Sequence, residues 1–188
     1  MLGIIKDEPE ALKQAISQAI NHADIVLSSG GVSVGDYDYV EEILKSLGGE
    51  IKVHAVAMKP GKPLTVATFP TPNSPIYFGL PGNPVSALVS YWRFVQPVIK
   101  QLSGIVSGWQ PKFIKAQTLN NLNSNGKRET YIWGKLDLVD GIYQFSAAGG
   151  SKSSGNLINL AQTNALAILK VGTKLVNAGE EVEVLIRE

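Results

Sequence analysis

The first half of the chain contains a loop, residues 28–38, that combines glycines with small polar side chains. The glycines let the backbone come close to a ligand, and the hydroxyl and amide groups can donate hydrogen bonds to phosphate oxygens. The residues concerned are Ser29, Gly30, Gly31, Ser33 and Gly35. A plain turn does not need three glycines and two serines in so few residues, so the loop predicts a site for an anion.

Asp38, at the end of this loop, has two interpretations. Asp38 and Glu41 have the spacing of a capping box, in which the aspartate is the N-cap of the following helix. Alternatively, the carboxylate takes part in the chemistry of the site. The residues alone leave both interpretations open.

A second loop, Lys59-Pro60-Gly61-Lys62-Pro63, places two lysines within a rigid frame of two prolines. Like charges that are held close together cost free energy unless an anion lies between them. A solvated charged turn is the alternative. The proline frame favours anion binding.

A third loop, residues 79–84, contains Pro81, Gly82 and Asn83 before a predicted helix. Asn83 is a favourable N-cap, and Pro84 suits the first helical position. Taken alone, this loop is explained equally well as a capped helix start.

The spacing of apolar residues predicts the elements that carry the three loops. Strands are predicted at residues 3–5, 24–28, 51–56, 64–69 and 76–79, and helices after Asp7, Asp38 and Asn83, the first with an Asp7–Glu10 capping box and the last kinked at Pro97. Strands that alternate with helices predict a parallel α/β sheet, whose ligands bind at the carboxyl ends of the strands. We therefore expect one cavity lined by Gly30, Gly31, Ser33, Lys59, Lys62 and Asn83.

The second half of the chain has a different pattern. Residues 105–111 resemble a linker, and strands are predicted at 113–119, 130–139, 142–147, 165–171 and 182–186, with a hairpin turn at Asp140-Gly141. No long helix is expected beyond residue 112. The residues thus predict an α/β domain over residues 1–104 and a small β-barrel or sandwich over residues 112–188.

Composition restricts the possible functions further. The 188 residues carry a net charge of +1, which argues against nucleic-acid binding, and contain no cysteine, which excludes disulfides and thiol catalysis. No apolar run reaches the ~20 residues of a membrane span, and charges near Met1 exclude a signal peptide. His22 and His54 lack metal-ligand spacing. We expect a cytoplasmic protein with a small-molecule ligand and no membrane contact.

Residues 29–39, 58–63 and 79–86, in that order, resemble the molybdopterin molybdenumtransferase family, which is related to the gephyrin E domain. The resemblance extends over essentially the whole chain. It implies the transfer of molybdate to the dithiolene of adenylylated molybdopterin, with release of AMP, in a homodimer. It also implies a divalent cation, usually Mg²⁺, beside the two substrates.

The resemblance assigns roles to individual residues. Asp38, Asp7, Lys59 and Lys62 match residues important for activity, and Asp38 is the candidate Mg²⁺ ligand. Positions expected to contact the cofactor are Ser29, Gly30, Gly31, Ser33, Gly35, Pro60, Gly61, Pro81, Gly82, Asn83, Ser86, Arg128 and Ser154. Arginine, lysine and amide donors suit oxyanions such as molybdate and phosphate.

This sequence also departs from the family pattern. Family members are longer, open the α/β domain with a Thr-Gly-Asp-Glu loop and commonly have arginine where this chain has Trp133. We therefore expect a fragment of such an enzyme, with a three-layer α/β domain that is truncated at its N-terminus and a small C-terminal β-barrel. Two alternatives stay open: a molybdopterin adenylyltransferase, which shares the α/β domain but lacks the β domain, and a non-catalytic dimerising scaffold.

Overall fold

The computed structural model describes residues 1–30, 37–149 and 160–187. The chain forms two compact units that do not follow one cut in the sequence. The first unit contains residues 1–56 and 61–90, and the second contains residues 57–60 and 91–188. The predicted division at residues 105–111 stays a prediction, although residues 91–104 belong with the second unit by compactness.

The first unit is built on a four-stranded sheet in the order β1-β5-β4-β2. Its strands are β1 (Ile25–Ser29), β2 (Glu50–Ala55), β4 (Pro63–Thr68) and β5 (Ile76–Leu80). β1 and β5 are parallel, whereas β4 is antiparallel to both β5 and β2. The expectation of a parallel sheet is therefore wrong for β4. Only seven residues, 69–75, connect β4 to β5, and such a short connection requires antiparallel neighbours.

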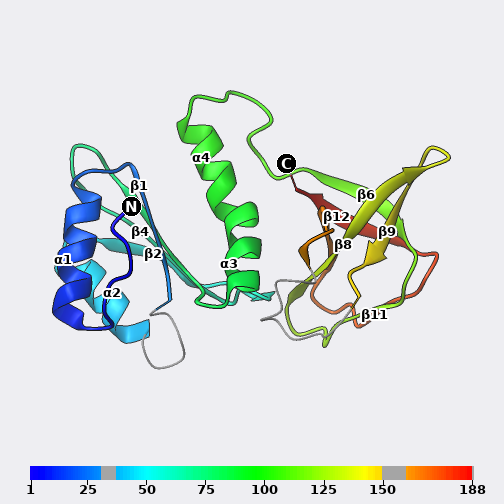
Figure 1. Cartoon of the computed structure of the whole chain (residues 1–188), viewed down its shortest axis with the longest axis horizontal. Coiled ribbons are helices and arrows are strands. Elements are labelled where there is room, and N and C mark those ends of the chain that lie inside the picture. The colour runs from blue at the N-terminus through cyan, green and yellow to red at the C-terminus, as the bar shows by residue number, and fades with distance from the viewer. Residues whose placement is uncertain (31–36, 150–159, 188) are drawn as a thin grey trace. The chain divides into compact units, whose positions relative to one another are not determined.

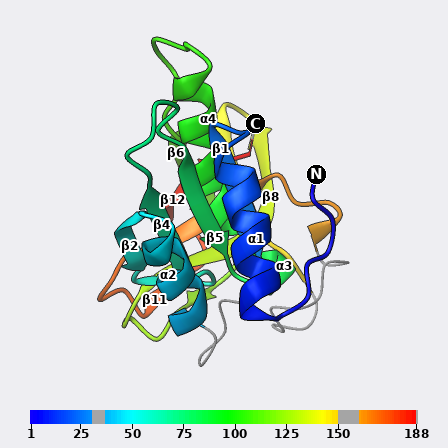
Figure 2. The same ribbon diagram turned by 90° about the vertical axis from the view of Figure 1, so that its left-hand side faces the viewer.

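Two helices cover one face of this sheet, as Figure 2 shows. They are α1 (Pro9–Ile20) and α2 (Tyr37–Ser46). Their apolar stripes meet the sheet in one buried cluster, which contains Ile16, Ile20, Val26, Val40, Ile43, Leu44, Ala67, Phe69 and Tyr77. A third helix, α3 (Pro84–Ser90), lies on the opposite face of this sheet and completes three layers (Figure 1). The predicted three-layer α/β architecture is confirmed.

The N-terminal segment differs from expectation. Residues 3–5 are not a strand, because no neighbouring strand pairs with them among the described residues. α1 begins at Pro9, and its N-cap Glu8 makes no side-chain capping bond. The predicted Asp7–Glu10 capping box is therefore not formed. Proline in the first turn suffices to start the helix, since the amide it lacks would have had no partner there.

A π-helical turn, Tyr91–Val95, lies between α3 and α4 (Gln96–Leu102), directly before Pro97, and the kink expected at this proline stays a prediction. Proline cannot donate a hydrogen bond to the preceding turn, so the helical pattern is interrupted directly before it. Turns of this kind widen the spacing of backbone hydrogen bonds by one residue.

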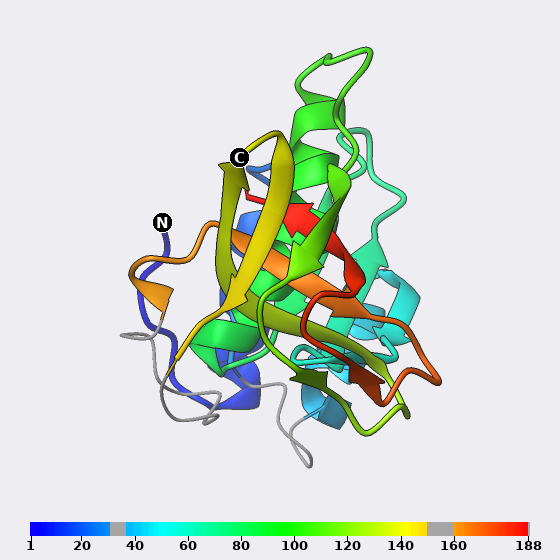
Figure 3. The ribbon, with the colours of Figure 1, turned by 90° about the vertical axis from the view of Figure 1, so that its right-hand side faces the viewer.

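The second unit is a closed β-barrel, shown in Figure 3. Its sheet has the order β10-β12-β6-β9-β8-β3, and an additional β10–β8 pairing closes five of these strands into a ring. The strands are β3 (Met58–Lys59), β6 (Phe113–Thr118), β8 (Glu129–Val139), β9 (Ile142–Ala147), β10 (Ala165–Leu169) and β12 (Glu181–Ile186). A separate pair joins β7 (Leu122–Asn123) to β11 (Leu175–Val176). No α-helix occurs in the described parts of residues 112–187, as predicted.

The barrel core depends on a close contact between β8 and β9. Phe145 is fully buried and packs over Gly134, where an added Cβ atom would lie 2.2 Å from the ring. The hairpin turn at Asp140-Gly141 has positive φ at both residues, as a type I′ turn requires, and confirms the predicted hairpin.

Within the described residues, no helix is long and apolar enough to span a bilayer.

Candidate functional site

The loops predicted to bind a ligand leave the same edge of the first unit's sheet. Ser29 at the end of β1 pairs with Leu80 at the end of β5, so the loops that follow both strands start side by side. β2 ends opposite the start of β4, where Ala55 pairs with Pro63. Because β4 is antiparallel to its neighbours, its beginning lies at the edge where β1, β5 and β2 end. Three loops thus converge there, as the sequence predicted.

The first and third loops touch through glycine. A Cβ atom added to Gly82 would lie 3.3 Å from the Cα atom of Gly30, so a side chain there would force the loops apart. Gly30 has a φ of +88°, a backbone conformation that residues other than glycine rarely adopt. These two positions therefore build the edge from backbone rather than from side chains.

Asn83 is the N-cap of α3, as predicted. Its Oδ1 atom accepts a hydrogen bond from the Ser86 amide at 3.1 Å and another from the Ser86 hydroxyl at 3.3 Å. Pro84 follows at the first helical position. This cap fixes the backbone of the third loop immediately after Pro81 and Gly82.

Lys62 lies at the same edge. The Val56 amide donates a hydrogen bond of 3.0 Å to the Lys62 carbonyl, which ties the second loop to the end of β2. Gly61 is buried with a φ of +104°, whereas the Lys62 side chain is exposed. Lys59 and Pro60 belong to the second unit, so the structure does not test whether the two lysines share an anion.

A cavity of about 610 Å³ lies beside β1 and α1. Most of its lining is apolar, and its polar members include Asp7, Ser29 and Gly30, which the sequence had selected. Tyr77 also lines it, and the Tyr77 hydroxyl is hydrogen-bonded to the hydroxyl of Ser28. Burial raises the pKa of Tyr77 above its usual value, and the bond to Ser28 partly offsets this rise. Asp7 is therefore brought to the cavity that Ser29 and Gly30 also line.

In the second unit, Arg128 and Lys59 flank one short strand pairing. Met58 and Lys59 of β3 pair in parallel with Glu129 and Thr130 of β8. An Arg128 Nη1 hydrogen donates to the Met58 carbonyl at 3.4 Å. Of the two cations predicted to bind oxyanions, Lys59 thus lies in this pairing and Arg128 directly precedes it.

The sequence analysis missed a partly buried chain of hydrogen bonds next to this pairing. Arg93 Nε donates to the Tyr131 hydroxyl at 3.0 Å, and that hydroxyl donates to Glu129 Oε1 at 2.6 Å. Burial, followed by the bond to Glu129, raises the pKa of Tyr131 far above its usual value, so the hydroxyl keeps its proton. Only the fold reveals this chain, because Arg93 is distant in sequence from both partners.

Several predicted residues lie outside the described part of the chain. They are Gly31, Ser33, Gly35 and Ser154. The backbone of Asp38 lies in the first turn of α2, as its second residue, and its roles as N-cap, catalytic residue or metal ligand stay predictions.

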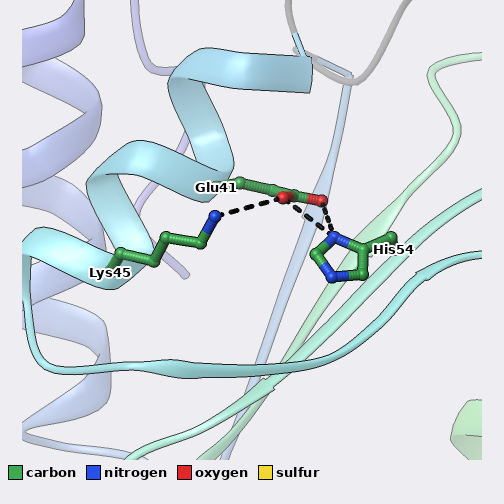
Figure 4. A network of polar contacts seen from close by, with 3 residues as sticks. All are labelled: Glu41, Lys45 and His54. Carbon is green, nitrogen blue, oxygen red and sulfur yellow. Dashed lines mark hydrogen bonds and ion pairs between the residues drawn. The ribbon is translucent and has the colours of Figure 1, made fainter.

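The capping box predicted for Asp38 and Glu41 stays a prediction, and the carboxylate of Glu41 has other partners. It accepts a hydrogen bond from His54 Nδ1 through both oxygens, at 2.8 and 3.0 Å, and lies 3.8 Å from the Lys45 ammonium (Figure 4). His54 is on β2, so this network ties α2 to the sheet. In the described residues no three His, Asp or Glu side chains are grouped to hold a metal.

Two family models match the chain. Residues 1–101 match the model described as a probable molybdopterin binding domain. Residues 115–186 match the MoeA C-terminal region, domain IV.

Curated proteins and solved structures resemble the chain over nearly its whole length. A molybdopterin molybdenumtransferase from Nostoc sp. (strain PCC 7120 / SAG 25.82 / UTEX 2576) is 64% identical over 98% of this chain and 42% of that protein. One from Staphylococcus aureus (strain COL) is 32% identical over 97% of this chain and 42% of that protein. The crystal structure of a molybdopterin biosynthesis MoeA protein from Pyrococcus horikosii superposes with a TM-score of 0.77 at 26% identity, covering 98% of this chain and 42% of that one. The chain thus spans less than half the length of these relatives.

Proposed function

Because the chain belongs to the molybdopterin-binding domain family and carries a MoeA C-terminal region, we propose that it acts in molybdenum cofactor biosynthesis as part of a molybdopterin molybdenumtransferase. The reaction is the insertion of molybdate into the dithiolene of adenylylated molybdopterin, with release of AMP. The observation that carries this proposal is the convergence of three loops at one sheet edge, with Gly30 against Gly82.

The chemistry of that edge suits an anionic substrate. Contact between Gly30 and Gly82 leaves backbone rather than side chains at the surface, and backbone amides can bind phosphate oxygens. Lys62 adds a positive charge there. We therefore propose that the phosphates of adenylylated molybdopterin bind at this edge, where Ser29, Pro81 and Asn83 also contact the substrate.

The remaining assignments follow the same chemistry. Lys59 and Arg128 would balance the charge of molybdate or phosphate, since lysine and arginine are the usual ligands of oxyanions. A magnesium ion that bridges phosphates needs only one or two protein carboxylates. Asp38 is the candidate ligand of that ion, and Asp7, which shares a cavity with Ser29 and Gly30, is a further carboxylate expected to be important for activity. When bound, the ion would neutralise phosphate charge. A cytoplasmic homodimer completes the proposal.

The β-barrel distinguishes this function from the adenylyltransferase alternative. The match of residues 115–186 to the MoeA C-terminal region favours the molybdenumtransferase. The scaffold alternative makes a different prediction, which is dimerisation without any affinity for nucleotide.

Calorimetric titration of the chain with AMP in the presence of Mg²⁺ tests the proposal. We expect saturable binding that Gly82→Val abolishes, because the added side chain would separate the Gly30 and Gly82 loops. Lys62→Ala should weaken binding several-fold, since a charge-assisted bond is lost. Lys13→Ala on α1 is the matched control, and its affinity should equal that of the unaltered chain. A dimer that binds no AMP would favour the scaffold.

A further inference from the structure

Tyr131 occupies an unusual place in the second unit. It is 3% exposed, yet its hydroxyl both accepts a hydrogen bond from Arg93 and donates one to Glu129. The Tyr131 hydroxyl therefore uses both its acceptor and its donor, and it joins a cation to an anion. Removing it would leave two charged groups short of a partner, which costs more than the bond itself contributes.

The cationic end of this chain is held in place by aromatic rings. The Arg93 guanidinium carbon lies 5.4 Å from the ring centre of Phe94 and 5.4 Å from that of Phe113. Such cation–π contacts restrict the direction of the guanidinium. Arg93 therefore offers a fixed donor to Tyr131.

The anionic end continues into the backbone that carries Lys59. The Glu129 amide donates to the Ala57 carbonyl at 3.0 Å, and Glu129 pairs with Met58. Lys59 follows in the same pairing, opposite Thr130. β3 has only two residues, so few hydrogen bonds hold it against β8. The hydrogen bond from the Tyr131 hydroxyl to the Glu129 side chain therefore contributes strongly to the stability of this strand pairing.

We propose that Tyr131 is a positioning residue, whose hydroxyl joins Arg93 to Glu129 and so fixes the β3–β8 pairing, which contains Lys59 and is directly preceded by Arg128. This inference rests on the proposed function for the role of the two cations in binding oxyanions. The placement of the pairing by Tyr131 is independent of any ligand. The bond from Arg128 to the Met58 carbonyl places the second cation under the same control.

Tyr131→Phe removes only the hydroxyl and is the first test. Hydrogen exchange of the Glu129 amide should become at least tenfold faster, because its bond to Ala57 opens more often, while amides of the β6–β12 pairing keep their rates. Tyr143→Phe, at an exposed site on β9, is the matched control and should change neither. Unchanged exchange at Glu129 in Tyr131→Phe would overturn the inference, whatever the ligand results.

A binding experiment separates positioning from general stability. The affinity of the chain for AMP should fall about fivefold in Tyr131→Phe, as expected for loss of one hydrogen bond. In a background with both Lys59→Ala and Arg128→Ala, loss of the Tyr131 hydroxyl should have little further effect on the affinity, because it acts through these two cations. Additive losses would contradict the proposal.

A conservative pair at Glu129 covers the case in which Tyr131→Phe does not fold. Glu129→Gln keeps an acceptor oxygen for Tyr131 and should retain slow exchange at residue 129, whereas Glu129→Ala should not. Equal behaviour of the two variants would overturn the inference. If the unaltered chain binds no AMP, the proposed function fails, and the exchange data still decide the role of Tyr131.

Discussion

The two units place their candidate site residues by different means. In the first unit, loops that follow β1, β2 and β5 reach one sheet edge because of strand direction alone, and Gly30 meets Gly82 through backbone. In the second unit, Lys59 and Arg128 are placed by a two-residue strand and by side-chain bonds that start as far away as Arg93. The first arrangement depends on local chain geometry, and the second depends on the packed barrel.

This difference predicts different sensitivities to substitution. Sites built from backbone at a sheet edge should tolerate changes to side chains nearby, provided that the glycines stay. Sites that depend on a packed core should respond to changes far from the ligand, because dense interiors transmit displacement.

The largest expected effect is at Gly134 in the barrel. A Cβ atom there would lie 2.2 Å from the Phe145 ring and 2.3 Å from the Ser146 carbonyl, so Gly134→Ala forces a shift of buried backbone. The free energy of unfolding should fall by about 3 kcal/mol, at the upper end for overpacking. Urea unfolding of the chain measures it. Gly149→Ala is the control, since a Cβ atom added there would have no atom within 4 Å apart from those of Gly149 and its two chain neighbours. A loss equal to that of the control would remove the contrast between the units.

High pH should weaken both units through their buried tyrosines. Burial raises the pKa of Tyr77 in the first unit and of Tyr131 in the second, from a usual value of 10.0. Below pH 10 these tyrosines are protonated in both the folded and the unfolded chain, so their full contribution to the free energy of unfolding is present. Above pH 10 the unfolded chain loses its protons first, so stability falls by up to about 1.4 kcal/mol per pH unit for each tyrosine.

Phenylalanine variants assign this alkaline loss to a unit. Tyr77→Phe and Tyr131→Phe should each flatten the decline of stability between pH 10 and 11.5, measured by urea unfolding at each pH. The exposed Tyr143 serves as control, and its replacement by phenylalanine should leave the decline unchanged. A decline that persists in the double variant would show that other groups cause it.

The capping bond of Asn83 should contribute less. Asn83→Ala removes the acceptor for the Ser86 amide and should lower the unfolding free energy by about 1 kcal/mol. Asn83→Asp keeps an acceptor and should stay close to the unaltered chain. Chemical denaturation measures the free energy of unfolding of the two variants and of the unaltered chain. The prediction fails if alanine and aspartate lose the same amount.

The smallest effect is expected at the surface network of Figure 4. His54 is 65% exposed and Glu41 15% exposed, so water screens their interaction. His54→Ala should cost about 0.5 kcal/mol, and 1 M salt should reduce the difference. His22→Ala, which removes a bond within α1's own C-terminal turn, provides the control at a second exposed histidine. If His54→Ala lowers the free energy of unfolding more than the control does, and by the same amount in 1 M salt, His54 acts through packing rather than through its charge.

Local patterns allowed much of the fold to be predicted. The Asn83 cap and the Asp140-Gly141 turn depend on residues within a few positions of each other, so their chemistry is visible in sequence. The strands of the barrel were predicted from apolar patterns to within a few residues. The convergence of the three loops followed from general rules for α/β sheets.

Long-range relations were not accessible in the same way. Residues 3–5 have the composition of a strand, but a strand forms only where a partner pairs with it. The direction of β4 depends on its neighbours rather than on its own residues. The chain from Arg93 to Glu129 brings together positions that no spacing rule connects.

The short strand β3 also has a consequence for the order in which the protein is made. Residues 57–60 belong to the second unit but interrupt the first, so the polypeptide crosses between the units at 56/57, 60/61 and 90/91. During synthesis β3 leaves the ribosome with the first unit and has no partner until Glu129 and Thr130 follow. The barrel is therefore a discontinuous folding unit. Separate expression of residues 1–104 and 112–188 would divide it, and the two pieces would have to reassociate before the barrel could regain β3.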